Sequence, residues 1–250
     1  MENISGEAAK RTALVVGADG GIGGALLSAL LEQEQHARVF AVSRSAAPAS
    51  AAAPAKLDWR QCDQTETGIA DVVDAIRESG MPLHRVVICP GILHGDGLRP
   101  EKALEQLRRS SMREVLDINT VLPTLWLSAL TPLLRDTPDA VVAVLSARIG
   151  SIGDNNLGGW YSYRASKAAL NMVLKTAAIE FARRAPRVKL LAFHPGTTDT
   201  ELSRPFQARV PADKLFEPDF VAQRLLAIME EAEMDGELSF VDWAGKSIPW

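Results

Sequence analysis

A glycine-rich segment directly follows the first β-branched run of the chain. Residues 11–16 read RTALVV, residues 17–24 read GADGGIGG, and residues 25–34 are apolar at helical spacing. A strand, a tight turn and a helix in this order are the context that a dinucleotide fingerprint requires. Glycine lets the backbone turn sharply and lets a pyrophosphate approach the amino end of a helix, where free N–H groups and the dipole favour an anion. The segment predicts a nucleotide site, and a glycine turn without a ligand is the alternative. The residues expected to line this site are Gly17, Asp19, Gly21, Ile22 and Gly23.

Short apolar runs alternate with helical patterns along the whole chain. This alternation predicts an α/β protein with a single-domain Rossmann fold, a doubly wound parallel sheet of about seven strands with helices on both faces. We expect residues 1–250 to form one domain, with residues 11–110 mainly as the dinucleotide-binding half and residues 111–250 as the catalytic and substrate half. The expected strands are 11–16, 37–42, 56–63, 85–89, 140–145, 188–193 and 238–243, and the expected helices are 25–34, 67–78, 111–134, 162–184 and 219–231.

Composition and charge narrow the classes of partner. The net charge is -4 and the sequence pI is about 5.7, so electrostatics favours neither nucleic acid nor an anionic membrane. No apolar run is long enough to span a bilayer, and the first residues lack the basic and apolar regions of a signal peptide. We therefore expect a cytoplasmic protein with Cys62 and Cys89 as buried thiols, and the sequence contains no metal-ligand cluster.

Residues at the expected strand ends extend the nucleotide site. Ser43 and Arg44 close the second strand, where a Rossmann sheet meets the adenosine ribose, and an arginine there can clamp a 2′-phosphate. Arg44 therefore favours NADP(H), with NAD(H) as the second option, and a plain surface arginine is the alternative. Asp63 is expected to accept a hydrogen bond from the adenine amine. The remaining expected cofactor contacts are Pro90, Gly91, Pro195, Gly196, Thr198 and Thr200.

Two residues of the expected helix 162–184 have the spacing of an acid–base pair. Tyr163 and Lys167 stand four positions apart, so the phenol and the ammonium share one helix face. A nearby cation favours the phenolate, so the pairing predicts a lowered pKa for Tyr163 and proton transfer at neutral pH. By itself this spacing is common, and a solvated helix face is the alternative.

A proline inside the expected helix 111–134 marks a disturbed turn. Ser111 and Glu114 have the spacing of a capping box, which predicts that the helix begins there. Pro123 has no N–H and frees the carbonyl of Asn119 one turn earlier, where a water can bind. A simple kink is the alternative.

Jointly, these residues resemble the short-chain dehydrogenase/reductase family over nearly the whole chain, from Arg11 to Trp243. The resemblance rests on the glycine segment, Asn119, the serine after the fifth expected strand, the Tyr163–Lys167 pair and Pro195-Gly196. Residues 146–171 are similar to the branch that includes the C-factor (C-signal) proteins and the carbonyl reductase sniffer.

The resemblance implies a role for each catalytic residue. Tyr163 is expected to protonate the carbonyl oxygen, Lys167 to hold the nicotinamide ribose and Asn119 to position a water of the proton relay. The family pattern Ser-Ser-x-x-Gly reads SARIG at residues 146–150, so Ala147 stands where the catalytic serine is usual. Ser146 is the expected replacement, and Ser151 is the second candidate.

Two functions of different classes follow. The first is an NAD(P)H-dependent oxidoreductase that reduces a carbonyl compound to an alcohol, or the reverse, with Tyr163 as general acid/base. The second is a dinucleotide-binding regulatory or signalling protein with little catalysis, which Ala147 and Pro90 favour. The expected partners are a small carbonyl or alcohol substrate and a second copy of the chain in a homodimer or homotetramer. Trp160 and Phe206 suggest an apolar or aromatic substrate.

Overall fold

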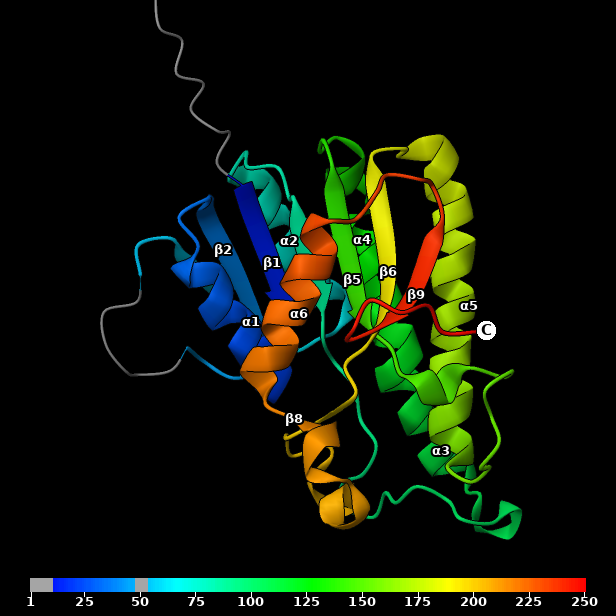
Figure 1. The fold of residues 1–250 in the computed structure, drawn as a ribbon. Coiled ribbons are helices and arrows are strands. Elements are labelled where there is room, and N and C mark those ends of the chain that lie inside the picture. The colour runs from blue at the N-terminus through cyan, green and yellow to red at the C-terminus, as the bar shows by residue number, and fades with distance from the viewer. Residues whose placement is uncertain (1–10, 48–53) are drawn as a thin grey trace, which may run out of the picture.

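One fully parallel sheet of seven strands organises the computed structural model, which describes residues 11–47 and 54–250 (Figure 1). The strand order is β3-β2-β1-β4-β5-β6-β9, and every adjacent pair is parallel. This confirms the predicted doubly wound α/β fold. The strands are β1 (Arg11–Val16), β2 (His36–Ser43), β3 (Leu57–Gln61), β4 (Arg85–Ile88), β5 (Ala140–Leu145), β6 (Val188–His194) and β9 (Leu238–Asp242).

Helices cover both faces of the sheet. The helices α1 (Gly21–Glu32) and α6 (Pro218–Glu230) pack on one face, and α2 (Glu66–Glu78), α4 (Leu122–Arg135) and α5 (Tyr161–Arg184) pack on the other (Figure 1). Because both faces are covered, the central strands are apolar throughout rather than alternating: all residues of β4 and β5 are buried. Two apolar cores result, one on each side of the sheet.

The segment predicted as one helix from 111 to 134 is divided by a wide turn. It consists of α3 (Arg109–Leu116), a π-helical turn (Asp117–Val121) and α4. The amide of Leu122, the first residue of α4, donates to the carbonyl of Asp117, and Pro123 is the second residue of α4. The prediction of a disturbed turn at Asn119 is confirmed. The capping-box prediction is wrong, because α3 begins after Arg108 and places Ser111 and Glu114 inside the helix.

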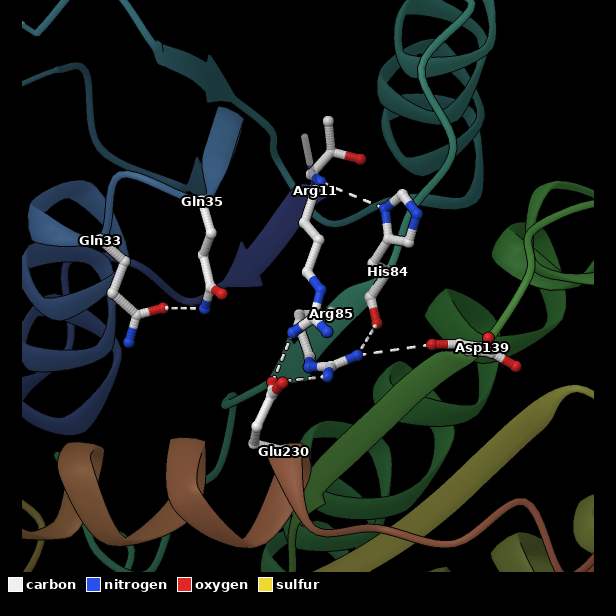
Figure 2. Close-up of polar contacts among 8 residues, drawn as sticks. Arg11, Gln33, Gln35, His84, Arg85, Asp139 and Glu230 are labelled. Carbon is white, nitrogen blue, oxygen red and sulfur yellow. Dashed lines mark hydrogen bonds and ion pairs between the residues drawn. The ribbon is translucent and has the colours of Figure 1, made fainter. Parts of the chain in front are cut away.

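A cluster of ion pairs ties α6 to the amino ends of β1 and β4 (Figure 2). The buried Arg85 donates to Glu230 at 2.8 Å, and Arg11 donates to the same carboxylate oxygen at 2.5 Å. Two adjoining cavities of about 430 and 560 Å³ flank this cluster, and neither is lined by a predicted site residue. The cluster anchors the end of α6.

Some predictions concern smaller features. Cys62 is buried and Cys89 is partly buried, and neither forms a disulfide. Within residues 11–47 and 54–250, every helix is too short or too polar to cross a bilayer. The residues on which the signal-peptide prediction depends lie outside the described residues.

Candidate functional site

Glycines at the end of β1 let two backbone segments touch. Gly17 has φ +82°, and a Cβ on Gly23 would lie 2.0 Å from the carbonyl oxygen of Gly17. A Cβ on Gly21 would lie 2.6 Å from the methyl group of Thr200, so Gly21 places the amino end of α1 against the segment that follows β6. Any larger residue at Gly21 or Gly23 would force the loop apart.

The amino end of α1 fits a dinucleotide pyrophosphate. Its first turn contains no acidic residue, and no side chain in the described part of the chain caps it. The first N–H groups of a helix have no carbonyl partner within the helix, so they are free for an anion. The absence of side chains at Gly20, Gly21 and Gly23 keeps this donor group open.

The end of β2 gathers the residues predicted to meet the adenosine ribose. Arg44 is exposed, and Ser43 accepts a hydrogen bond from the amide of Ser45 at 3.0 Å. Ser45 donates to Asp19 at 3.0 Å. Burial opposes ionisation of Asp19, but hydrogen bonds from Ser43 and Ser45 outweigh it and hold the pKa of this carboxyl below its usual value. Asp19 and Arg44 therefore belong to one polar cluster.

Asp63 has a local partner in the structure. One oxygen of its carboxylate accepts the amide of Thr65 at 2.9 Å and the hydroxyl of Thr65 at 2.7 Å, next to the start of α2. These hydrogen bonds lower the pKa of Asp63. The second oxygen has no hydrogen bond within the described ranges, so Asp63 shapes the loop and keeps one acceptor for a ligand.

Asn119 joins the π-helical turn to the segment after β4. It is completely buried, accepts the amide of Ile92 at 2.7 Å and donates to the carbonyl of Ile92 at 2.9 Å. It also donates to Ser166 at 3.0 Å. A Cβ on Gly91 would lie 3.4 Å from the Asn119 side-chain oxygen and 3.6 Å from Lys167 Nζ. Asn119, Gly91 and Lys167 therefore meet at one point.

Tyr163 and Lys167 share one face of α5. Lys167 Nζ lies 5.9 Å from the centroid of the Tyr163 ring and donates to the carbonyl of Leu145, at the end of β5, at 2.8 Å. Burial lowers the pKa of Lys167 to about 8 and raises the pKa of Tyr163 to about 12. The expected lowering of the phenol pKa is therefore corrected, because removal from water outweighs the nearby ammonium.

The hydroxyl of Ser146 has a hydrogen-bond partner on α5. Ser146 is buried and donates to the side-chain oxygen of Asn171 at 2.6 Å. This hydrogen bond uses the hydroxyl proton, so Ser146 has no proton left for a substrate oxygen in this arrangement. Ser151 is also buried, and its hydroxyl accepts the amide of Asp154 at 3.0 Å. Ala147, which follows Ser146 in the sequence, has no polar side-chain group.

The segment after β6 leads from the sheet to the outer wall of the site. Gly196 has φ +75°, and a Cβ on this residue would lie 2.6 Å from the ring of Phe216, so only glycine leaves room for that ring. Thr198 is buried, and its carbonyl accepts the hydroxyl of Ser203 at 2.5 Å. This turn holds Thr200 against Gly21, so the segment that contains Pro195, Gly196 and Thr198 reaches the glycine segment through Thr200.

Aromatic rings stand next to the Tyr163 phenol. The Trp160 ring lies 6.3 Å from the Tyr163 ring and 4.9 Å from Phe206, and His94 lies 5.7 Å from Phe206. His94 also contacts the carbonyl of Glu201 at 3.1 Å. Segments distant in sequence therefore form one apolar wall beside Tyr163.

Three polar residues around the site were missed by the sequence reasoning. Ser166 links Asn119 to the carbonyl of Tyr163, Asn171 binds Ser146, and Glu101 binds the start of α5. Ser166 and Asn171 lie on α5 at positions that face inward, which helical spacing alone suggests. Glu101 lies in an irregular segment with no sequence signal.

Known proteins resemble this chain in sequence. Residues 11–210 match the family described as short chain dehydrogenase. The 1-hydroxy-2-glutathionyl-2-methyl-3-butene dehydrogenase of Rhodococcus sp. (strain AD45) is 31% identical over 195 residues, which cover 78% of this chain and 81% of that protein. The C-signal protein of Myxococcus xanthus is 32% identical over 148 residues, which cover 59% of this chain and 84% of that protein.

A solved structure has the same fold. The NADPH-bound carbonyl reductase from chicken fatty liver superimposes with a TM-score of 0.82 over 96% of this chain and 99% of that chain, at 23% identity. Because the family match runs from residue 11 to residue 210, this chain belongs to the short-chain dehydrogenases/reductases, which confirms the resemblance in its sequence and makes it an NAD(P)-dependent oxidoreductase.

Proposed function

We propose that this protein reduces a carbonyl compound to an alcohol, or catalyses the reverse, with Tyr163 as the general acid/base. The observation that carries the proposal is the meeting of Asn119, Gly91 and Lys167 on the side of α5 that bears Tyr163. Carbonyl reduction needs a proton donor at the oxygen, and the phenol stands beside an aromatic wall that can hold the substrate.

The two pKa values suit the direction of reduction. With a pKa of about 12, Tyr163 keeps its proton at neutral pH, and with a pKa of about 8, Lys167 keeps most of its charge. Lys167 uses one N–H on the carbonyl of Leu145 and has two more donors for the ribose and for a relay water. The carbonyl of Asn119, freed by Pro123, is the proposed acceptor for that water.

The proposed cofactor is NADP(H), which supplies or accepts the hydride when bound. The amino end of α1 would hold the pyrophosphate, and Arg44 and Ser43 would hold the 2′-phosphate. The chicken carbonyl reductase of the same fold binds NADPH, which supports this choice. Asp19 lies in the same cluster, and its negative charge opposes a phosphate, so Arg44 must outweigh it.

The regulatory alternative has two observations in its favour. Ser146 is hydrogen-bonded to Asn171 rather than free, and C-signal of Myxococcus xanthus is 32% identical over 148 residues. Under this alternative the chain binds the nucleotide and reduces no carbonyl. The proposed assembly is a homodimer or homotetramer through the helical segment 111–134 and α5, and α5 carries the exposed Met172 and Ile179.

A single variant separates the two functions. We expect Tyr163→Phe to abolish NADPH-dependent reduction of aromatic and aliphatic ketones, because only the proton donor is removed. We expect its affinity for NADPH, followed by quenching of tryptophan fluorescence, to stay within about twofold of the wild type, and both proteins to bind NADH more weakly.

The wild type is the control for both readouts. Full reductase activity in Tyr163→Phe would contradict the assigned acid. Nucleotide binding by the wild type with no reduction of any ketone in the panel would favour the regulatory alternative.

A further inference from the structure

We propose that Glu101 is a positioning residue that holds the first turn of α5, and with it Trp160, beside Tyr163. The inference rests on the proposed function only for its kinetic test. Glu101 lies in the segment before a 3-10 turn (Leu104–Gln106). It is 61 residues from Ser162 in the sequence but contacts the start of α5 in space.

Three hydrogen bonds join Glu101 to the start of α5. The amide of Ser162 donates to one carboxylate oxygen at 3.1 Å, and the hydroxyl of Ser162 donates to the other. The carbonyl of Glu101 accepts the amide of Trp160 at 2.5 Å. The Trp160 side chain makes no capping hydrogen bond, so Glu101 supplies the acceptor and the negative charge that the amino end of a helix favours.

Burial of the Glu101 carboxylate costs hydration free energy, which hydrogen bonds must replace. Its exposed fraction is 4%, and it forms no ion pair with any residue in the described part of the chain. A buried carboxylate is stable only when hydrogen bonds replace its lost water. Within the described residues, all the side-chain hydrogen bonds of Glu101 come from Ser162, so its carboxylate acts on α5.

The backbone that Glu101 holds is strained. Gly158, Gly159 and Trp160 have φ angles of 63°, 66° and 53°, three successive residues in the left-handed region. A bulky residue such as tryptophan rarely adopts this conformation, which persists only where surrounding contacts enforce it. Glu101 supplies one contact, and Arg164 supplies another by donating to the carbonyls of Gly158 and Gly159 at 3.1 and 2.9 Å.

This strain decides where the indole stands. In the left-handed conformation, Trp160 places its ring edge-on to Tyr163, at an interplanar angle of 72°, and against Phe206. If the backbone relaxed, the indole would leave this position and the aromatic wall would open. Glu101 therefore affects substrate binding through Trp160, and the effect is largest for an aromatic carbonyl compound.

The first test reads the position of Trp160 without catalysis. Protein labelled with 5-fluorotryptophan gives ¹⁹F resonances, and Trp160→Phe identifies the one from Trp160. We expect Glu101→Ala to shift or broaden this resonance alone. Glu101→Gln keeps an acceptor for Ser162 and should shift it less. The matched control is Glu105→Ala, an exposed carboxylate of the same segment, which should leave it unchanged.

The second test measures KM and kcat separately, so that an effect on substrate binding is distinguished from an effect on the chemical step. With 1-phenyl-1,2-propanedione as substrate, we expect Glu101→Ala to raise KM about tenfold, because a displaced wall weakens substrate binding, and to change kcat less. The NADPH affinity should stay at the wild-type value. Glu101→Gln should recover most of the wild-type KM.

Several outcomes would overturn the proposal. They are an unmoved Trp160 resonance with an unchanged KM in Glu101→Ala, equal effects in Glu105→Ala, or a loss of NADPH affinity that parallels the loss of activity. If Glu101→Ala does not fold, the same criteria apply to Ser162→Ala, which removes the hydroxyl that donates to Glu101. If the wild type reduces no ketone, the proposed function fails, and the ¹⁹F test still decides the role of Glu101.

Discussion

At the scale of single residues, burial rather than charge governs the proton equilibria of the site. Tyr163 and Lys167 are both shifted by removal from water, the phenol upward to about 12 and the ammonium downward to about 8. Both shifts favour the neutral form of the group. At neutral pH Tyr163 therefore keeps its proton and can donate it, and Lys167 is mostly charged but loses its proton more easily than an exposed lysine.

The sequence leaves open which residue donates a hydrogen bond to the substrate oxygen, with Ser146 and Ser151 as the candidates. We expect Ser146→Ala to lower kcat less than about tenfold, because the hydroxyl already donates its proton to Asn171. Loss of a true oxyanion donor costs about 10²–10³ in kcat. Steady-state kinetics with saturating NADPH measures the difference.

Ser151→Ala is the companion variant, since Ser151 is the second candidate and its hydroxyl keeps its own proton free while it accepts from Asp154. A fall of a hundredfold or more in Ser146→Ala, with Ser151→Ala unchanged, would return the catalytic role to Ser146 and contradict this prediction.

At the scale of elements, the π-helical turn between α3 and α4 is an irregularity that serves the site. It brings Asn119 to Ile92 and Ser166, and Pro123, four residues later, has no N–H to donate to the carbonyl of Asn119. Such wide turns are rare and frequently occur at functional sites. The turn joins the strand-end loop after β4 to the catalytic helix.

Replacing this proline separates stability from activity. We expect Pro123→Ala to raise the free energy of unfolding by at most about 1 kcal/mol, because a new N–H can pair with the carbonyl of Asn119 but proline carries little penalty in a first helical turn. We expect kcat to fall, because that carbonyl is the proposed acceptor for the relay water. Urea unfolding and steady-state kinetics measure the two effects.

The same helix contains a matched control. Pro132 lies inside α4, away from the described site, so Pro132→Ala should also stabilise the fold but leave kcat unchanged. An unchanged kcat in Pro123→Ala would remove the carbonyl of Asn119 from the proposed relay.

At the scale of the whole molecule, buried histidines make stability depend on pH. Burial lowers the pKa of His36, at the amino edge of the sheet, to about 4, and that of His194, at the carboxyl edge, also to about 4. Both ring nitrogens of His36 lack a hydrogen-bond partner in the described part of the chain. Protonation of either ring therefore opposes folding.

The direction of the effect follows from the lowered pKa. An unfolded histidine takes up a proton near pH 6.5, so the stability from neutral His36 is complete above that pH and decreases as the pH falls toward about 4. Between pH 7.5 and pH 5 we expect a loss of about 2 kcal/mol from His36 alone. Urea unfolding of the wild type and of His36→Gln at both pH values measures it.

His94→Gln is the control, because His94 stands at the mouth of the site and not in a core. The variant His36→Gln should lose about 2 kcal/mol less than the wild type between the two pH values. Equal losses in wild type and His36→Gln would show that His36 is not buried in its neutral form.

Local chemistry accounts for the features that the sequence predicted well. Strand and helix positions follow from apolar runs and periodicity, which depend on neighbours along the chain, and the structure differs from them by few residues. The glycine segment and the Tyr163–Lys167 face were predictable for the same reason, because tight turns and helical spacing are local geometry. The capping box failed because the helix begins earlier than its pattern suggests.

By itself the sequence determined the α/β class, the family, the glycine turn and the residues that stand at the strand ends. Only the tertiary structure decided the partner of Ser146, the raised pKa of Tyr163 and the clamp that Glu101 makes on Trp160. Each of these depends on contacts between segments far apart in the chain, or on how much water reaches a group. The spacing of residues along the chain predicts neither these contacts nor the access of water, because both arise only when the helices pack on the sheet.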